Sequence, residues 1–113
     1  MKSILALAVS AAIGVGGAPL AQTRQLGQDA IQALFPGSFD VSFKHKTYFT
    51  VTAHANGTMT GKLAGITDRG TWSVRGRKLC IAFSRWNEGR TKCKDVFLEG
   101  GWIRSGTFFF RRR

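Results

Sequence analysis

The sequence is poor in the residues that usually carry catalysis or bind metals. Its 113 residues include two histidines, two cysteines and six acidic side chains. Neither His45 nor His54 stands at metal-ligand spacing from another histidine, a cysteine or a carboxylate. Ser84 lies near Arg85 and Glu88 but has no histidine close by in sequence to activate it, and no glycine-rich loop suits a phosphate. We therefore expect no catalytic residues, no metal site and no cofactor, and we expect that the protein is not an enzyme.

Acidic residues are also scarce relative to basic ones. Seventeen lysines and arginines face six acids, which gives a formal net charge of +11. The excess is concentrated from Lys44 onward, where 15 bases stand against four acids. A small domain with this imbalance attracts anions. The alternative is a soluble protein that is basic without a specific anionic partner.

Long apolar runs are confined to the first residues. Met1 and Lys2 form a short basic start, residues 3–17 are small and apolar, and residues 18–21 resemble a cleavage region. The run is too short for a membrane span, and no second charged flank follows it as an anchor would require. The sequence predicts a signal peptide over residues 1–21 and a single domain over residues 22–113. We expect a periplasmic or secreted protein.

The two cysteines, Cys80 and Cys93, are expected to pair, because disulfides form readily in exported proteins. Residues 70–96 read as a strand followed by a β-hairpin, with the cysteines on either side of the turn at residues 86–89. The closed loop has 14 residues, and the chain-entropy model gives such a closure about 3 kcal/mol of stability. Pairing also withdraws both thiols from catalysis and metal binding.

Only the residues before Pro36 show a helical pattern. Leu26, Ala30 and Leu34 recur at helical spacing within residues 23–35, and Thr23 is a candidate cap. From Phe39 onward the apolar residues alternate with polar ones, as in half-buried strands. The predicted strands span residues 39–43, 47–53, 58–64, 71–74, 79–85, 91–98 and 102–110.

These patterns predict a mainly β fold: an antiparallel meander of about six or seven strands with one short N-terminal helix and one disulfide. Asn56-Gly57 between two β-rich runs is a strong hairpin signal. The meander could close into a small barrel or remain a curved sheet, and either would manage its edges.

The disulfide hairpin contains a conflict. Direct pairing of the two cysteines places three apolar residues on one face with two lysines, because side chains alternate along strands; these are Leu79, Ile81, Phe83, Lys92 and Lys94. Such a face cannot be purely solvated. A bulge could shift the register, the helix or a partner could cover the face, or the lysine stems could shield it.

Basic residues gather in and beside this hairpin, with tryptophans between them. Arginine beside exposed aromatic rings suits phosphate or sugar recognition. We expect Trp72 and Trp102 in the core and Trp86 exposed at the hairpin tip, where it could stack on a ligand. The candidate anion-binding residues are Arg75, Arg77, Lys78, Arg85, Arg90, Lys92, Lys94 and Trp86.

The tail, residues 108–113, consists of three phenylalanines followed by three arginines. The structural interpretation is a last strand with a solubilising basic end. The functional alternative is peripheral contact with an anionic membrane surface.

The chain resembles an uncharacterised family of small exported proteobacterial proteins. The matching features are residues 34–37 (Leu-Phe-Pro-Gly), Tyr48-Phe49 with the turn at residues 57–58, residues 70–72 (Gly-Thr-Trp), Leu79-Cys80 and a second cysteine at Cys93. The resemblance covers most of residues 22–113. It implies a periplasmic or secreted β-domain and no assigned activity.

We therefore predict an exported, non-enzymatic binding module. Its basic face would engage an anionic envelope component, such as lipopolysaccharide or an acidic glycan, or an acidic protein partner, and no specific nucleic acid. The alternative is a small lipocalin-like barrel that binds an apolar ligand in its interior.

Overall fold

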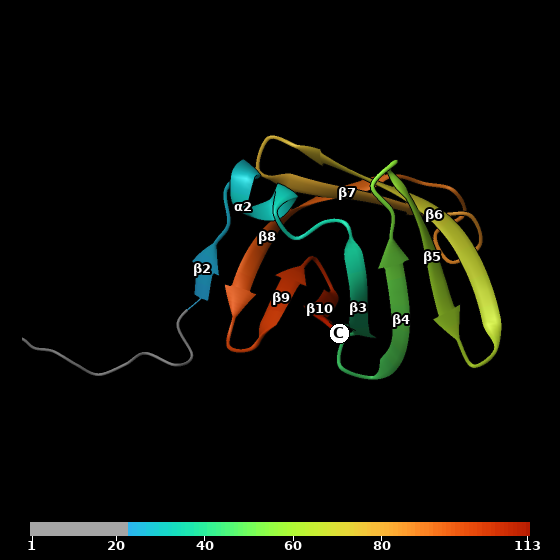
Figure 1. The fold of residues 1–113 in the computed structure, drawn as a ribbon. Helices are drawn as coiled ribbons and strands as arrows, with labels where there is room; N and C mark the ends of the chain where they lie inside the picture. Colours follow the sequence, from blue (N-terminus) through green and yellow to red (C-terminus); the bar gives the residue numbers. More distant parts are fainter. Residues whose placement is uncertain (1–22) are drawn as a thin grey trace, which may run out of the picture.

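The computed structural model describes residues 23–113, so the predicted signal peptide (residues 1–21) lies outside the described residues. The described part contains one short helix and nine strands (Figure 1). In chain order they are β2 (Thr23–Gln25), α2 (Gln28–Gln32), β3 (Gly37–Phe43), β4 (Thr47–Ala53), β5 (Thr58–Leu63), β6 (Ile66–Arg75), β7 (Lys78–Phe83), β8 (Lys92–Glu99), β9 (Trp102–Ser105) and β10 (Phe108–Arg112).

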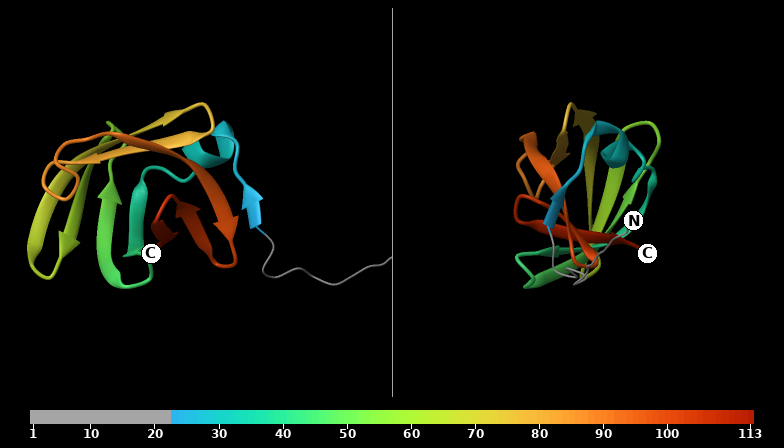
Figure 2. Two further views of the ribbon diagram at one scale, coloured as in Figure 1. Left: turned by 180° about the vertical axis from the view of Figure 1, so that it is seen from behind. Right: turned by 90° about the vertical axis from the view of Figure 1, so that its left-hand side faces the viewer.

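Eight of these strands form a closed antiparallel barrel. From β3 to β10 each strand pairs with the next along the chain, and β10 returns to pair with β3. The ninth strand, β2, extends the wall by pairing with the end of β8 (Figure 2). The predicted mainly β meander is confirmed, and of the two architectures expected it is the barrel. Closure leaves β3 to β10 without a free edge along the ring.

The strand count differs from the prediction in two places. Residues 66–70, expected in a loop, belong to the ten-residue strand β6. Their mostly polar sequence lacks the apolar alternation of a strand, although each of these residues pairs with β5. The last predicted strand, residues 102–110, with an expected break at residues 105–106, consists of two strands, β9 and β10, on either side of a turn at Gly106, which has a positive φ of 63°.

Within the segment predicted as an N-terminal helix, residues 23–35, the structure has a short helix over residues 28–32. Residues 23–25 are drawn into the sheet by pairing with β8, so Thr23 is not a cap; Gly27 occupies that position without a side-chain hydrogen bond. Ile31 is fully buried, and the Phe35 ring stacks on Trp72 with 4.5 Å between centroids. The helix segment therefore packs over one end of the barrel (Figures 1 and 2).

Side chains alternate between the barrel interior and its outer face, as strand geometry requires. At the end near α2 the interior is filled by apolar side chains, including the edge-to-face pair Phe39–Phe110 at 5.4 Å. The buried core consists of Leu26, Ile31, Phe39, Val41, Val51, Ala53, Met59, Leu79, Phe83, Val96 and Phe110.

The two ends of the barrel differ in the segments that cover them. The closed end carries α2 and the connecting segments 26–36, 54–57, 76–77 and 100–101. The open end carries the hairpin tips and loops 44–46, 64–65, 84–91 and 106–107. Within residues 23–113 no helix has the length and apolar character needed to cross a membrane.

Candidate functional site

The barrel interior is hollow toward the open end. A cavity of about 530 Å³ lies there, within the usual size range of small-molecule sites. An eight-stranded barrel has just enough interior for packed side chains or for one small ligand. Most of the lining is apolar: Phe43, Phe49, Leu63, Leu79, Ile81, Phe83, Trp86 and Phe108. The polar part of the lining comprises Thr47, Asn87, Lys92, Lys94, Ser105 and Thr107.

The cavity continues toward the core. A small void of about 40 Å³ lies deeper in the barrel and is lined entirely by apolar side chains. Five residues line both spaces: Phe49, Leu79, Ile81, Phe83 and Phe108. The site is therefore apolar at its deep end, and its charged groups come from one wall.

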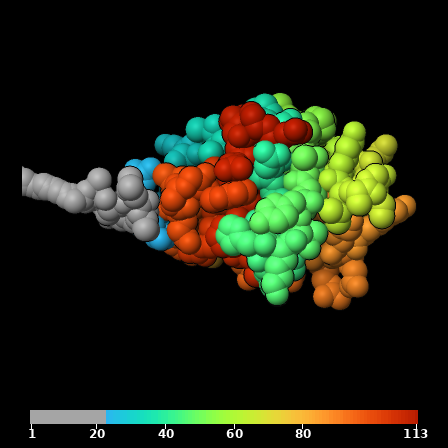
Figure 3. Space-filling view, turned by 90° about the horizontal axis from the view of Figure 1, so that it is seen from below, coloured from blue at the N-terminus to red at the C-terminus, as the bar shows by residue number. Residues whose placement is uncertain are grey.

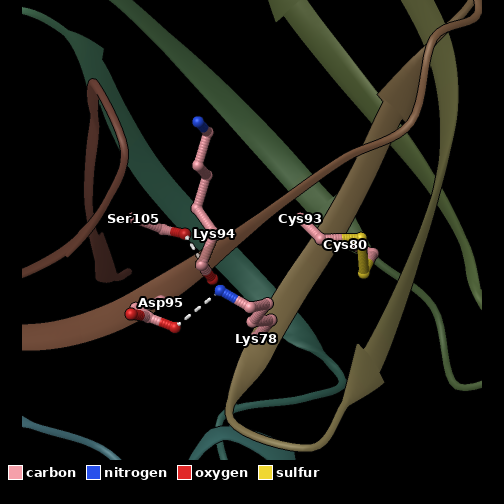
Figure 4. Close-up of polar contacts among 6 residues, drawn as sticks. All are labelled: Lys78, Cys80, Cys93, Lys94, Asp95 and Ser105. Atoms are coloured by element: carbon pink, nitrogen blue, oxygen red, sulfur yellow. Dashed lines mark hydrogen bonds and ion pairs between the residues drawn. A yellow bond between two sulfur atoms is a disulfide. The ribbon is translucent and has the colours of Figure 1, made fainter.

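That wall is β8, whose Lys92 and Lys94 face the barrel interior. The register pairs Ile81 with Lys92 and Leu79 with Lys94, while Cys80 pairs with Cys93 on the outer face. Figure 4 shows the Lys94 side chain on the face of β8 opposite to Lys78 and Asp95, which form an ion pair at 3.1 Å. The Lys94 stem also lies beside Gly106, where an added Cβ would stand 3.2 Å from its Cγ.

The conflict in the disulfide hairpin is resolved by barrel closure. The disulfide is confirmed, and the two cysteines pair directly without a bulge. The face that combines three apolar residues with two lysines is the inner face of the barrel, which the other strands cover. An isolated hairpin could not bury that face, so the sequence alone presented it as a contradiction.

Neither cavity lysine has an ion-pair partner among residues 23–113. Four of the six acids are engaged with other bases, in the pairs Lys78–Asp95, Arg90–Glu88, Arg104–Glu99 and Arg113–Asp40. The other two are Asp29, in the first turn of α2, and the buried Asp68. The interior wall thus carries two positive charges that these six acids do not neutralise.

Loop 84–91 begins beside the cavity, where Asp68 holds its first residues and Trp86 and Asn87 line the wall. The Asp68 carboxylate is 3% exposed and accepts hydrogen bonds from three backbone N–H groups, those of Arg69 (2.9 Å), Arg85 (3.0 Å) and Trp86 (3.0 Å). Within the loop, Asn87 Nδ2 donates to the Arg90 carbonyl at 2.6 Å. The loop therefore has a defined conformation, with Trp86 turned into the barrel.

The charge of Asp68 is stabilised by these donors. Burial by itself raises the pKa of the carboxyl, but the N–H groups of Trp86, Arg85 and Arg69, together with the Arg85 charge, lower it by more. The pKa of Asp68 therefore lies below its ordinary value. Asp68 is ionised at neutral pH and acts as the anchor of the loop.

Trp86 can enter the barrel because the strand facing it carries a glycine. A Cβ built on Gly61 would lie 2.5 Å from Trp86 Cζ3, well inside contact distance. The indole packs edge-on against Phe49 at 5.2 Å and tilted against Phe83 at 5.0 Å. Trp86, expected to be exposed, is therefore half-buried and lines the cavity.

The predicted anion-binding residues do not lie on one face. Arg75, Arg77 and Lys78 stand at or beside the β6–β7 turn of the closed end. Arg85 and Arg90 belong to the loop at the open end, before β8 begins at Lys92. Only three of the eight, Lys92, Lys94 and Trp86, meet in the cavity. Anion binding by any of them remains a prediction.

The other aromatic residues take two different positions. Trp72 points inward, as expected, and its Nε1 donates to the His54 carbonyl at 2.9 Å. Trp102 is not in the core; it lies on the outer face beneath the Arg111 guanidinium, 4.5 Å from the ring centroid. In the tail, Phe108 and Phe110 face inward and the arginines contact neighbouring segments.

Sequence reasoning did not single out Asp68 and Gly61 as parts of the site. Both lie in polar or glycine-containing segments, and their roles arise from the β5–β6–β7 pairing rather than from any local motif. Across residues 23–113, no three His, Cys, Asp or Glu side chains gather in a group able to hold a metal ion.

Comparison of the chain with protein-family models, with curated proteins and with solved structures gives no match. The resemblance to small exported proteobacterial proteins therefore remains a prediction. Function is inferred from the geometry of the cavity.

Proposed function

We propose that this protein is a non-enzymatic binding module that takes up a small amphipathic anion, with the apolar body inside the barrel and the anionic head at Lys92 and Lys94. One observation carries the proposal: two lysines without ion-pair partners among residues 23–113 project into an otherwise largely apolar cavity. We therefore prefer ligand binding inside a lipocalin-like barrel to anion binding on a basic outer face. The two lysine charges would make the cavity selective for anionic ligands over neutral ones.

The apolar lining favours the body of such a ligand. Burying apolar surface is favourable by about 25 cal/mol per Å², and Phe49, Ile81 and Phe108 offer that surface at the deep end of the cavity. A ligand with a short hydrocarbon chain or a ring system would displace water from these side chains. A neutral apolar ligand would be bound by this burial of apolar surface alone, without any contribution from the lysines.

The lysines favour an anionic head. A carboxylate or a phosphate monoester placed between the two ammonium groups would form charge-assisted hydrogen bonds, which are stronger than neutral ones. Both lysines remain exposed enough to be hydrated, so the head would stay near the wet end of the site. This arrangement avoids the large cost of burying an unpaired charge.

The proposal includes an exported protein acting in the periplasm or outside the cell. Its support is the Cys80–Cys93 disulfide, which is typical of oxidising compartments. It assigns the protein no reaction and no cofactor.

A matched ligand series tests the proposal. Dodecanoate, dodecyl phosphate and dodecanol share one chain and differ in the head, and Trp86 in the cavity wall supplies a fluorescence signal. We expect both anions to bind roughly tenfold or more tighter than the alcohol. The comparison between carboxylate and phosphate then identifies the preferred head.

The variant K92M/K94M removes both charges and keeps apolar bulk. It should bind dodecanoate no better than dodecanol, with dodecanol affinity unchanged or improved. The control variant K78M removes a lysine from the outer face of the same hairpin and should leave both affinities unchanged. Equal binding of anion and alcohol by the wild-type protein would contradict the proposal.

A further inference from the structure

We infer that the open end of the barrel is a docking surface for an anionic lipid membrane. The inference concerns the outer rim, whereas the proposed function concerns the cavity, so each can fail without the other. The rim consists of residues 43–48, 63–66, 84–91 and 106–107, which surround the mouth of the cavity. The β3–β4 hairpin and loop 84–91 project from the body of the molecule in Figure 3.

The rim is basic. It carries four basic residues, Lys44, Lys46, Arg85 and Arg90, and a single acid, Glu88, so an anionic surface would attract it. The closed end is basic as well, since Arg75, Arg77 and Lys78 stand at or beside its β6–β7 turn. The feature that distinguishes the rim is therefore the combination of these charges with exposed apolar side chains.

Exposed apolar side chains gather on the same rim. Across residues 23–113, the large hydrophobic residues that are exposed number three: Phe43 (37% exposed), Tyr48 (59%) and Ile66 (52%). All three lie at strand ends of the open end, on two different hairpins. Apolar and aromatic tips beside lysines are the composition of a surface that inserts shallowly into a lipid headgroup region.

The backbone at the hairpin tips supports this reading. Lys44 and His45 both have positive φ, 56° and 57°, in a turn where glycine or asparagine is the usual choice. A non-glycine residue in this region costs conformational energy. The turn is fixed by hydrogen bonds from Lys46 N to the Phe43 carbonyl and from Lys44 N to the Thr107 carbonyl, each 3.0 Å. These hydrogen bonds hold the backbone of Lys44 in place at the rim. A glycine would adopt this conformation at lower energy, but it would not supply a positive charge there.

A membrane fits these features better than a soluble acidic protein does. The charges and the apolar tips are distributed around the mouth on separate hairpins, so a broad surface can contact them together. An amphipathic anion in the cavity could then exchange with the lipid layer without crossing water.

Vesicle co-sedimentation tests the inference with the full, oxidised protein. Vesicles of phosphatidylcholine alone are compared with equimolar phosphatidylcholine and phosphatidylglycerol over a salt series. We expect binding to the anionic vesicles only, weakened by salt. The rim variant K44Q/K46Q should lose roughly tenfold or more in affinity, whereas the closed-end control R75Q/R77Q, with the same loss of charge, should lose about twofold or less.

Two further variants keep the test decisive. I66S should weaken the binding that remains at high salt, because it removes an apolar tip without changing charge. K92M/K94M should still bind vesicles even though it has lost the cavity charges, which separates docking from ligand binding. Circular dichroism and thermal unfolding of K44Q/K46Q that match those of the wild-type protein confirm that this variant is folded.

Three results would overturn the inference. Equal losses in the rim and closed-end variants would mean that net charge alone drives binding. Binding of poly-glutamate as tight as binding of anionic vesicles would assign the rim to soluble polyanions. Absence of vesicle binding at low salt would exclude a membrane role for this surface.

Discussion

Asp68 illustrates how a single side chain sets the shape of the site. Its carboxylate is the acceptor for three backbone N–H groups, two of them at the start of loop 84–91. Those groups would otherwise be left unsatisfied near the cavity, at a cost of about 1–3 kcal/mol each if buried. The carboxylate therefore links β6 to the loop that carries Trp86.

We predict that D68N lowers the free energy of unfolding by about 2 kcal/mol at neutral pH, because an amide has one acceptor oxygen and no charge. The folded-state pKa of Asp68 is lowered, so its stabilisation is fully present above the unfolded value near 3.9 and is lost as the pH falls through the folded value. Urea unfolding at several pH values checks this. The gap between wild type and D68N should narrow toward acid pH, and a constant gap would contradict it.

Gly61 sets the position of Trp86 in a different way, through the absence of a side chain. We predict that G61A displaces the indole, because its Cβ would stand 2.5 Å from Trp86 Cζ3. The ring would move into the cavity, and dodecanoate affinity should fall roughly tenfold. Fluorescence titration measures both effects. An unchanged Trp86 emission spectrum and unchanged affinity would show that the position of the indole does not depend on the absence of a side chain at Gly61.

Among the elements, the β7–β8 hairpin carries both the disulfide and the cavity lysines. Its outer face holds Cys80–Cys93 and the Lys78–Asp95 ion pair, and its inner face holds Lys94 (Figure 4). Lys92 lies on the same inner face, two residues before Lys94 along β8. The ion pair is exposed and contributes little, about 0–1 kcal/mol. The disulfide is the stronger constraint on the register that directs the lysines inward.

We predict that C80S/C93S lowers the free energy of unfolding by about 3 kcal/mol, since it reopens a 14-residue loop. Chemical denaturation of wild type and variant gives the difference. In the folded variant the lysines should still face the cavity, because barrel closure also fixes the register, so dodecanoate binding should persist. Loss of binding in a folded variant would show that the disulfide alone positions β8.

The sequence predicted those elements whose signals are local. The Asn56-Gly57 hairpin is observed, with Gly57 at a φ of 89°, and so are the β6–β7 turn and the disulfide. Residues 66–70 were predicted as a loop because Ile66 is followed by threonine, aspartate, arginine and glycine, which show no apolar alternation. Pairing with β5 determines the conformation of this segment, and a strand's pairing partner cannot be identified from the segment's own sequence.

At the scale of the whole molecule, barrel closure decides which predicted residues form a site. The sequence placed Lys92 and Lys94 beside Leu79 and Ile81 correctly, but it could not show that this face was enclosed. The same closure sends Arg75 and Arg77 to one end and Arg85 and Arg90 to the other. A single basic face was a reasonable expectation for a hairpin in isolation, and it fails because the strands wrap around a common axis.

Barrel closure also explains where the side chains of the phenylalanine-rich tail lie. Phe108 and Phe110 become part of the barrel lining when β10 pairs with β3. Two of the three phenylalanines thus line the interior, whereas Phe109 lies against the His45 ring, with 4.0 Å between centroids. Arg113 pairs with Asp40 at 3.2 Å. The exposed apolar residues that remain lie at the rim of the mouth, which is why the membrane proposal concerns the rim.

The most direct test of the central claim is to locate the ligand. Dodecanoate carrying a nitroxide near its methyl end would broaden the amide NMR signals of nearby residues. We predict the strongest broadening at Phe49, Ile81 and Phe108, with weaker broadening at Glu88 and Gly89 in the exposed part of loop 84–91, and chemical-shift changes at Lys92 and Lys94 from the unlabelled ligand. Broadening confined to the outer face, with the cavity residues unaffected, would contradict binding inside the barrel.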